Sequence, residues 1–229
     1  MFDNLVWGGR VLQLLRIFRG GDQKVAVIRH SERPSFDDLP YHEWDYAGLT
    51  DKGTEAALRF GRAIGAAQNP KCLQILWWGL RRCALTAEAI SEGAREEGCH
   101  VLAPSVIALK SPIAKREEYN KALHSGQWNQ FIANWLLDES PQVAMVPAQR
   151  YAKEIYRSLL AVEMRSADRI TIIVTHDLHI LPLVRLVFSS SSRWIDYLDG
   201  VVFRVEGEKI DIGFDGVIVS IRRDRLFSE

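Results

Sequence analysis

The stretch Lys24-Val25-Ala26-Val27-Ile28-Arg29-His30 decides the fold, because a short apolar run ends in an arginine and a histidine. Its valines and isoleucine predict a buried strand over residues 24–28, and the polar residues 31–34 begin a loop. Open α/β sheets bind ligands beyond the carboxyl ends of their strands. We therefore expect Arg29 and His30 to lie at a ligand-binding edge.

A second histidine occupies a similar place later in the chain. His176 follows the apolar run of residues 170–175, and Asp177 comes directly after it. The β-branched residues of this run predict another buried strand. Two histidines at strand ends, with arginines around them, indicate phosphate chemistry.

Strand and helix patterns alternate along the rest of the chain. A helix is expected from Thr50, which can cap it, to somewhere near residues 65–69. The further expected elements are a strand at 71–78, a helix at 81–98, a short strand near 100–102, helices around 117–137 and 148–166, a helix at 178–188, and a meander of strands at 200–205, 209–212 and 217–221. This order predicts an α/β fold, a three-layer sandwich with a mostly parallel central sheet and helices on both faces.

Length and charge limit what kind of protein the chain can be. With 229 residues, 47% of them hydrophobic, it can bury a full core, and we expect residues 24–229 to form a single domain. Lys plus Arg number 29 and Asp plus Glu number 29, so no overall field favours nucleic acid or an anionic membrane. The three cysteines have neither metal-ligand spacing nor a Cys-x-x-Cys pair, which favours a reducing cytoplasm.

Residues 1–23 contain two strongly apolar stretches, which Arg10, Arg16 and Arg19 interrupt. A membrane span needs about 20 apolar residues and a secretory signal needs an unbroken apolar centre, so neither pattern is met. We expect an amphipathic segment packed on the domain. The alternative, which we do not favour, is a basic amphipathic segment lying on a membrane or a partner.

Residues 31–49 form a loop that is too long for a simple turn and carries several large rings. Loops beyond about 12 residues are usually functional or disordered, and the rings argue against disorder. Tyr41, His42, Trp44 and Tyr46 are candidates for the mouth of a site, although burial of rings to order the loop explains them equally well.

Arginines near the two strand ends suit a phosphate ester. A phosphomonoester carries close to two negative charges, which planar guanidinium groups neutralise well. We expect Arg29, Arg33 and Arg82 to converge on one phosphate, and the helix that opens at Arg82 adds partial positive charge.

The histidines and the aspartate supply the reactive groups. Neutral imidazole is nucleophilic at physiological pH, so His30 is the candidate that accepts the phosphoryl group, and His176 is a hydrogen-bond donor from the opposite side. An alkoxide leaves poorly, so an acid must protonate it, and Asp177 is placed for that role.

Four segments of the chain resemble signatures of the histidine phosphatase superfamily, also called the phosphoglycerate-mutase-like fold. They are Val27-Ile28-Arg29-His30, Leu49-Thr50-Asp51-Lys52-Gly53, Arg82-Cys83-Ala84-Leu85-Thr86-Ala87 and Val174-Thr175-His176-Asp177. The matches occur in order and at compatible strand and helix positions, which makes the combined signal strong. The resemblance implies that His30 is the phosphorylated residue and that the phosphate pocket is completed by Arg29, Arg33, Arg82 and His176.

The resemblance leaves the general acid open. The acid-phosphatase branch has a His-Asp pair like His176-Asp177, but it usually has Gly at the position of Ser31 and a Pro one place beyond Pro34. The mutase-like branch takes its acid from a mid-chain Glu, for which Glu117 is the nearest match, and it usually has Ser where Trp78 stands. The acid is therefore Asp177 or Glu117, with Glu118 as a further choice.

The leading hypothesis is a metal-independent phosphomonoesterase that acts through a phosphohistidine on a small phosphorylated molecule, with no cofactor and no nucleic acid. The alternatives are a phosphoglycerate-mutase-like phosphotransferase, a catalytically weak phosphate-binding module, and a metal-dependent His-Asp phosphohydrolase. A mutase needs extra positive charge for its substrate's carboxylate, and residues 31–49 hold no obvious basic cluster. His176 and His179 have no third ligand at workable spacing for a metal.

Overall fold

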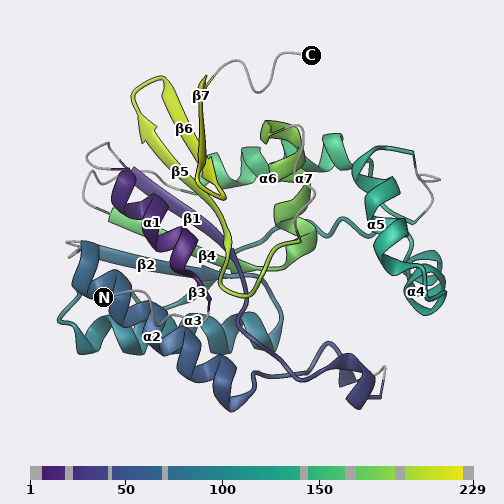
Figure 1. Ribbon diagram of the computed structural model, residues 1–229, viewed down its shortest axis with the longest axis horizontal. Coiled ribbons are helices and arrows are strands. Elements are labelled where there is room, and N and C mark those ends of the chain that lie inside the picture. The colour runs from purple at the N-terminus through teal and green to yellow at the C-terminus, as the bar shows by residue number, and fades with distance from the viewer. Residues whose placement is uncertain are drawn as a thin grey trace.

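The stretch that opened the sequence analysis forms the strand β1 (Gln23–Arg29) near the middle of a mixed sheet (Figure 1). The computed structural model describes residues 7–18, 23–40, 43–68, 72–139, 144–162, 169–188 and 194–223. Within these ranges seven strands follow the order β3-β2-β4-β1-β5-β6-β7. The other strands are β2 (Cys72–Trp77), β3 (Ser105–Val106), β4 (Arg169–Thr175), β5 (Gly200–Glu206), β6 (Lys209–Phe214) and β7 (Val217–Arg222).

Most of the strands run in one direction. The strands β3, β2, β4 and β1 pair in parallel, whereas β5, β6 and β7 are joined to β1 and to one another by antiparallel pairing. Only β5 and β7 therefore oppose β1. The predicted mostly parallel sheet is confirmed, and the expected C-terminal meander forms its antiparallel part.

Helices cover both faces of the sheet, as the sequence predicts. The described helices are α1 (Gly9–Ile17), η1 (Phe36–Asp38), α2 (Asp51–Gln68), α3 (Arg81–Glu96), α4 (Arg116–His124), α5 (Trp128–Leu136), α6 (Ala148–Ala161) and α7 (Asp177–Phe188). One apolar core joins α1, α2 and α3 to the sheet face that carries Ala26 and Ile28. A second core joins α5, α6 and α7 to the opposite face, through Val25 and Val27 (Figure 1). Alternate residues of β1 thus enter different cores, which is why its sequence is continuously apolar.

Two expected elements differ from the structure. The short strand predicted near residues 100–102 is a single bridge between Leu73 and Val101, and the strand that pairs with β2 is β3, a few residues later. The helical region predicted over 117–137 is divided into α4 and α5, because Gly126 adopts a positive φ of 72° that helices do not contain. The last residues of the helix predicted at 148–166 lie outside the described residues.

The N-terminal segment contributes to a core. Val11, Leu12, Leu14 and Leu15 of α1 are buried and belong to the same cluster as α2 and α3. At the start of the helix Arg10 forms ion pairs with Asp199 and Asp215, at 3.3 and 3.1 Å. The apolar side of α1 is therefore covered by the protein itself. Residues 1–6 and 19–22 lie outside the described residues.

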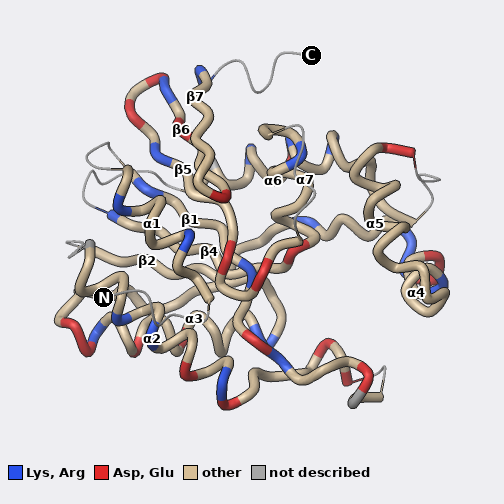
Figure 2. The backbone as a smooth tube through the Cα atoms, viewed as in Figure 1, with Lys and Arg blue, Asp and Glu red and all other residues tan. Residues whose placement is uncertain are grey.

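Charges of both signs are spread over the described elements. Figure 2 shows Lys and Arg interspersed with Asp and Glu on helices, strands and loops of both halves of the molecule. Because no region of the chain is uniformly basic, the predicted cluster of Arg29, Arg33 and Arg82 can form only where the fold brings these residues together. Among the described residues, no helix combines the length and the apolar character needed to cross a membrane.

Candidate active site

The two strand-end histidines meet because their strands are neighbours in register. Arg29 of β1 pairs with Thr175 of β4, and the backbone N–H of His30 donates to the carbonyl of Thr175 at 2.8 Å. The residue that follows β4 is His176. Its ring centroid lies 4.9 Å from that of His30, in an edge-to-face arrangement. Parallel pairing thus brings together two residues that are far apart in sequence.

The imidazole of His30 is held neutral with one nitrogen free. Its Nδ1 lies 2.7 Å from the carbonyl oxygen of Ser31, and because a carbonyl only accepts, Nδ1 carries the proton. The ring is 2% exposed, and burial, followed by the charges of Arg82 and Arg29, holds the pKa of His30 well below its usual 6.5. Nε2 therefore presents an unprotonated lone pair, which is what a nucleophile requires.

The loop after His30 is fixed by the starts of two helices. The Ser31 hydroxyl donates to the Gly53 carbonyl of α2 at 2.6 Å, and the Ser31 N–H donates to Thr86 of α3 at 3.0 Å. Thr50, as expected, caps α2 by accepting the N–H of Gly53 at 2.9 Å, and its own hydroxyl donates to Glu32 at 2.8 Å. Ser31, together with Thr50, Gly53 and Thr86 of the signature segments, thus holds the loop after His30 in place.

Three guanidinium groups lie around the histidines. Arg29 donates to the Ile195 carbonyl at 2.7 Å and lies over the Tyr197 ring, whose centroid is 4.6 Å away. Arg82 donates to the Trp44 carbonyl at 2.9 Å. The Nε atoms of both arginines are buried, and neither has an acceptor among the described residues. Both guanidinium groups line the cavity that also holds His30 and His176, where charged N–H donors suit an anionic oxygen.

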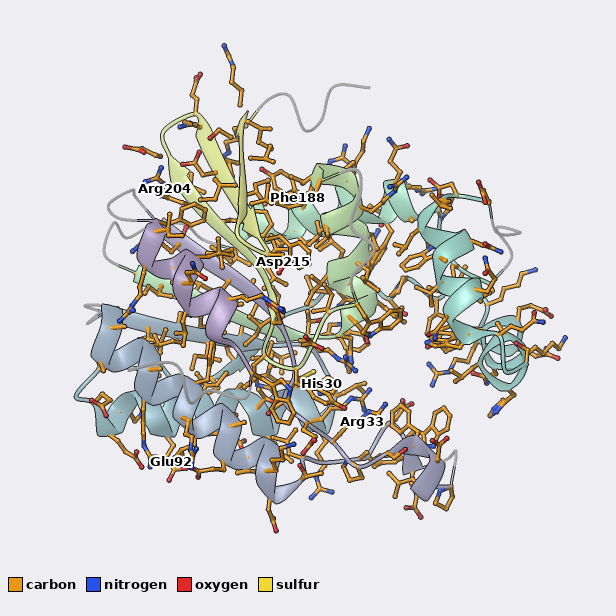
Figure 3. All side chains as sticks on the ribbon, viewed as in Figure 1. His30, Arg33, Glu92, Phe188, Arg204 and Asp215 are labelled. Atoms are coloured by element: carbon orange, nitrogen blue, oxygen red, sulfur yellow. The ribbon has the colours of Figure 1, made fainter. Side chains whose placement is uncertain are left out.

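Arg33 forms the outer part of the cluster. Its guanidinium lies 3.1 Å from the centroid of the Phe36 ring and donates to the Pro34 carbonyl at 2.6 Å. Burial lowers the pKa of Arg33 to about 10, which still leaves it charged at neutral pH. His30 and Arg33, both labelled in Figure 3, line the same cavity.

His176 is a buried neutral imidazole as well. Burial, followed by the nearness of the His30 ring and the charge of Arg82, holds the pKa of His176 well below 6.5. Its Nε2 lies 3.6 Å from the Sγ of Cys83, and burial raises the pKa of this thiol to about 12, so that the sulfur keeps its proton. His179 lies behind it, bonded to the Thr175 hydroxyl at 2.6 Å and packed against Trp78, so that it serves in packing.

Of the candidate acids, the structure brings Asp177 to the cluster and leaves Glu117 outside. Asp177 begins α7, and its Oδ2 accepts the indole N–H of Trp194 at 3.1 Å and faces the Arg29 Nη2 at 3.4 Å. The Glu117 side chain is 84% exposed and pairs with Lys121 one turn along α4, at 3.7 Å. Glu118 pairs with the same lysine at 2.8 Å, and neither glutamate lines the cavity. Their helical spacing to Lys121 turns both carboxylates towards solvent.

The cluster forms the base of a cavity of about 790 Å³. All the predicted site residues except Glu117 line it, and so do Trp44 and Trp78 from the sequence analysis. Tyr46 is 72% exposed and does not line the cavity, and Tyr41 and His42 lie outside the described residues. Sequence analysis assigned no site role to the lining residues Glu32, Phe36, Asp45, Arg116, Tyr119, Trp128, Trp194 and Tyr197.

Little in the sequence marks these additional residues. Trp194 and Tyr197 come from the segment before β5, where no periodic pattern or helix signal singles them out. Tyr119 and Trp128 lie on α4 and α5, where aromatic residues usually indicate packing. Among the described residues, no three His, Cys, Asp or Glu side chains are grouped as metal ligands.

Comparison with solved structures identifies the fold. The chain is similar to YhfR from Bacillus stearothermophilus, with a TM-score of 0.62 and 16% identity over 86% of this chain and 98% of that one. It is also similar to an alpha-ribazole phosphatase from Shigella flexneri, with a TM-score of 0.56 and 15% identity over 85% of this chain and 96% of that one. A phosphoglycerate mutase from Bacillus anthracis has a TM-score of 0.54 and 13% identity over 87% of this chain and 91% of that one.

These likenesses confirm the phosphoglycerate-mutase-like fold, which the resemblance of the four sequence segments predicts. At such low identity they concern the fold alone. No family model matches the sequence, and no curated protein matches it significantly. The function has to be argued from the site.

Proposed function

We propose that the protein is a phosphomonoesterase that forms a phosphohistidine on His30, with Asp177 as the general acid. One observation carries this proposal: a neutral imidazole with a free Nε2 lies among three guanidinium groups that line the same cavity. A phosphate dianion supplies both the acceptors and the electrophile that this arrangement lacks.

The reaction proceeds in two displacements. In the first, Nε2 of His30 attacks phosphorus, the bond to the ester oxygen breaks, and that oxygen takes the proton of Asp177. In the second, water attacks the phosphohistidine, gives a proton to the Asp177 carboxylate, and the P–N bond breaks. Arg29, Arg82 and His176 donate to the oxygens of the transferred group in both steps.

Hydrolysis accounts for the cavity better than transfer to a second hydroxyl of a phosphoglycerate. The cationic residues that line the cavity are Arg29, Arg33, Arg82 and Arg116. The last of these already forms an ion pair with Asp45, at 3.1 Å. A substrate carboxylate that bound Arg116 would have to break this ion pair, and Arg29, Arg33 and Arg82 are the arginines proposed to hold the phosphate. We infer a small phosphorylated substrate, since a cavity of about 790 Å³ suits a single small molecule.

The three unpaired cysteine thiols agree with a cytoplasmic location.

The test is hydrolysis of 4-nitrophenyl phosphate in the presence of a chelator. His30→Ala should lower kcat/KM by on the order of a thousandfold or more, because it removes the proposed acceptor of the phosphoryl group. His100→Ala, an exposed histidine outside the cavity, is the matched control and should leave the rate unchanged.

A second experiment looks for the proposed phosphohistidine directly, because phosphate bound to histidine is labile in acid. Rapid quenching with base should trap an acid-labile phosphate on the unmodified chain and none on His30→Ala. A protein that binds inorganic phosphate without hydrolysing the aryl ester would be a phosphate-binding module. Loss of activity in the chelator would instead support the metal-dependent class.

A further inference from the structure

Beyond the phosphate-binding base, the cavity is walled largely by aromatic rings. They are Phe36, Trp44, Trp78, Tyr119, Trp128, Trp194 and Tyr197, and each is only partly buried. They come from the loop after β1, the end of β2, the helices α4 and α5, and the segment before β5. Partly exposed aromatic surface gathered in one cavity is typical of a site that binds apolar ligand surface.

In two of these walls the rings pack against one another. On the loop side, Phe36 and Trp44 stack with centroids 4.3 Å apart, and Arg33 covers Phe36. On the helix side, Tyr119 meets Trp128 edge to face at 5.4 Å. Because each ring already has an aromatic neighbour, a ligand ring placed between the walls orders fewer side chains of the protein on binding.

An ion pair joins the two walls. Asp45 on the loop side binds Arg116 at the start of α4, at 3.1 Å. The acidic residues that line the cavity beside these walls are Glu32, Asp37 and Asp45. Of the cations near them, Arg116 is in that ion pair, and Arg33 lies over the Phe36 ring and donates to the Pro34 carbonyl. A second anionic group on the substrate would therefore meet three carboxylates, and the cations near them are already engaged. The outer cavity favours an uncharged, ring-bearing group.

We propose that this cavity selects phosphomonoesters of ring-bearing, uncharged alcohols, so that the phosphate is the only anionic group of the substrate. The inference rests on the proposed phosphatase activity and specifies its substrate class. The arginines and histidines hold the phosphate, and the aromatic walls hold the ring of the leaving alcohol.

The first experiment compares three synthetic esters whose leaving groups are all primary alcohols of similar basicity. They are propyl phosphate, 3-phenylpropyl phosphate and 3-(4-carboxyphenyl)propyl phosphate. Burial of a ring between aromatic walls should raise kcat/KM for the phenylpropyl ester by about tenfold or more over the propyl ester, chiefly through KM. The added carboxylate should remove most of this gain.

The second experiment changes the wall. Trp128→Ala should lower the ratio of kcat/KM for the phenylpropyl and propyl esters by about tenfold, and Trp128→Phe should restore most of it. Tyr46→Ala, an exposed ring in the same loop as Trp44 and outside the cavity, is the control and should leave the ratio unchanged. If Trp128→Ala does not fold, the comparison of kcat/KM for the three esters on the unmodified protein still tests the proposed substrate class.

The outcomes separate this inference from the proposed function. If the protein hydrolyses none of the three esters, and 4-nitrophenyl phosphate is also untouched, the phosphatase proposal fails. If His30-dependent hydrolysis occurs but the phenylpropyl ester is no better than the propyl ester, the phosphatase proposal stands and the substrate class is wrong. Preference for the carboxylated ester overturns it as well.

Discussion

At the scale of single residues, the site depends on keeping polar side chains buried and in one protonation state. His30 is neutral because burial and two neighbouring guanidinium groups disfavour its charged form. Its tautomer is fixed by one carbonyl, that of Ser31. The position of the Asp177 side chain is fixed by contacts with Trp194 and Arg29. The chemistry of the site thus depends on a few direct contacts, each made by one or two neighbouring residues.

The role of Asp177 predicts a dependence on the leaving group. Asp177→Asn keeps the shape of the side chain and an acceptor for Trp194, but it has no proton to give to the departing oxygen. We expect kcat/KM for an alkyl phosphate to fall by about a hundredfold or more, and kcat/KM for 4-nitrophenyl phosphate to fall much less. Steady-state kinetics on the two esters measure this difference.

The control for that variant is Asp196→Asn. Asp196 is 60% exposed, pairs with Arg10 at 3.6 Å and does not line the cavity, so both rates should stay as they are. If Asp177→Asn slowed the two esters equally, Asp177 would be holding Arg29 in position, and the acid would have to be sought elsewhere.

At the scale of elements, the sequence predicts the strands and their ends better than the loops between them. The runs at 24–28 and 170–175 are recognisable because both faces of these strands are buried, and their carboxyl ends meet by the geometry of parallel pairing. The side chains of Trp194 and Tyr197 reach the cavity only through tertiary packing, which no local pattern encodes. Glu117 is a candidate by resemblance alone. Whether its side chain faces the cavity or solvent depends on the rotation of α4 about its axis, which the sequence does not specify.

One glycine shows how an element positions the site. A Cβ at Gly53, in the first turn of α2, would lie 2.2 Å from the backbone oxygen of Glu32, two residues after His30. Gly53→Ala should therefore push the loop away from α2, lower the free energy of unfolding by roughly 1–3 kcal/mol and reduce kcat. Urea denaturation and kinetics on 4-nitrophenyl phosphate measure the two effects.

Gly9→Ala serves as the comparison for Gly53→Ala. A Cβ at Gly9, at the start of α1, meets nothing within 4 Å, so this change should leave stability and activity nearly as they are. If Gly53→Ala and Gly9→Ala had the same stability and activity, the close approach of α2 to the loop after His30 would not be needed for either property.

At the scale of the whole molecule, three neutral imidazoles are buried in one region. Burial is the leading cause that lowers the pKa values of His30, His176 and His179, the last to about 3. In the unfolded chain each ring has its ordinary pKa near 6.5. Below that pH the unfolded state binds more protons than the folded state, so the free energy of unfolding falls as the pH falls. Above it, the three groups make no pH-dependent contribution.

This difference predicts a steep loss of stability in mild acid. Between pH 6.5 and the lowered pKa values, each ring should cost up to about 1.4 kcal/mol per pH unit, so the limiting slope for three rings is about 4 kcal/mol per pH unit. Urea denaturation from pH 8 to pH 5 measures the slope. His179→Gln removes one titrating ring while keeping a hydrogen-bond partner for Thr175, and it should reduce the slope by about a third. A flat profile between pH 7 and pH 5 would show that these imidazoles are hydrated or charged in the native state, and His30 would then lack the protonation state that its attack on phosphorus requires.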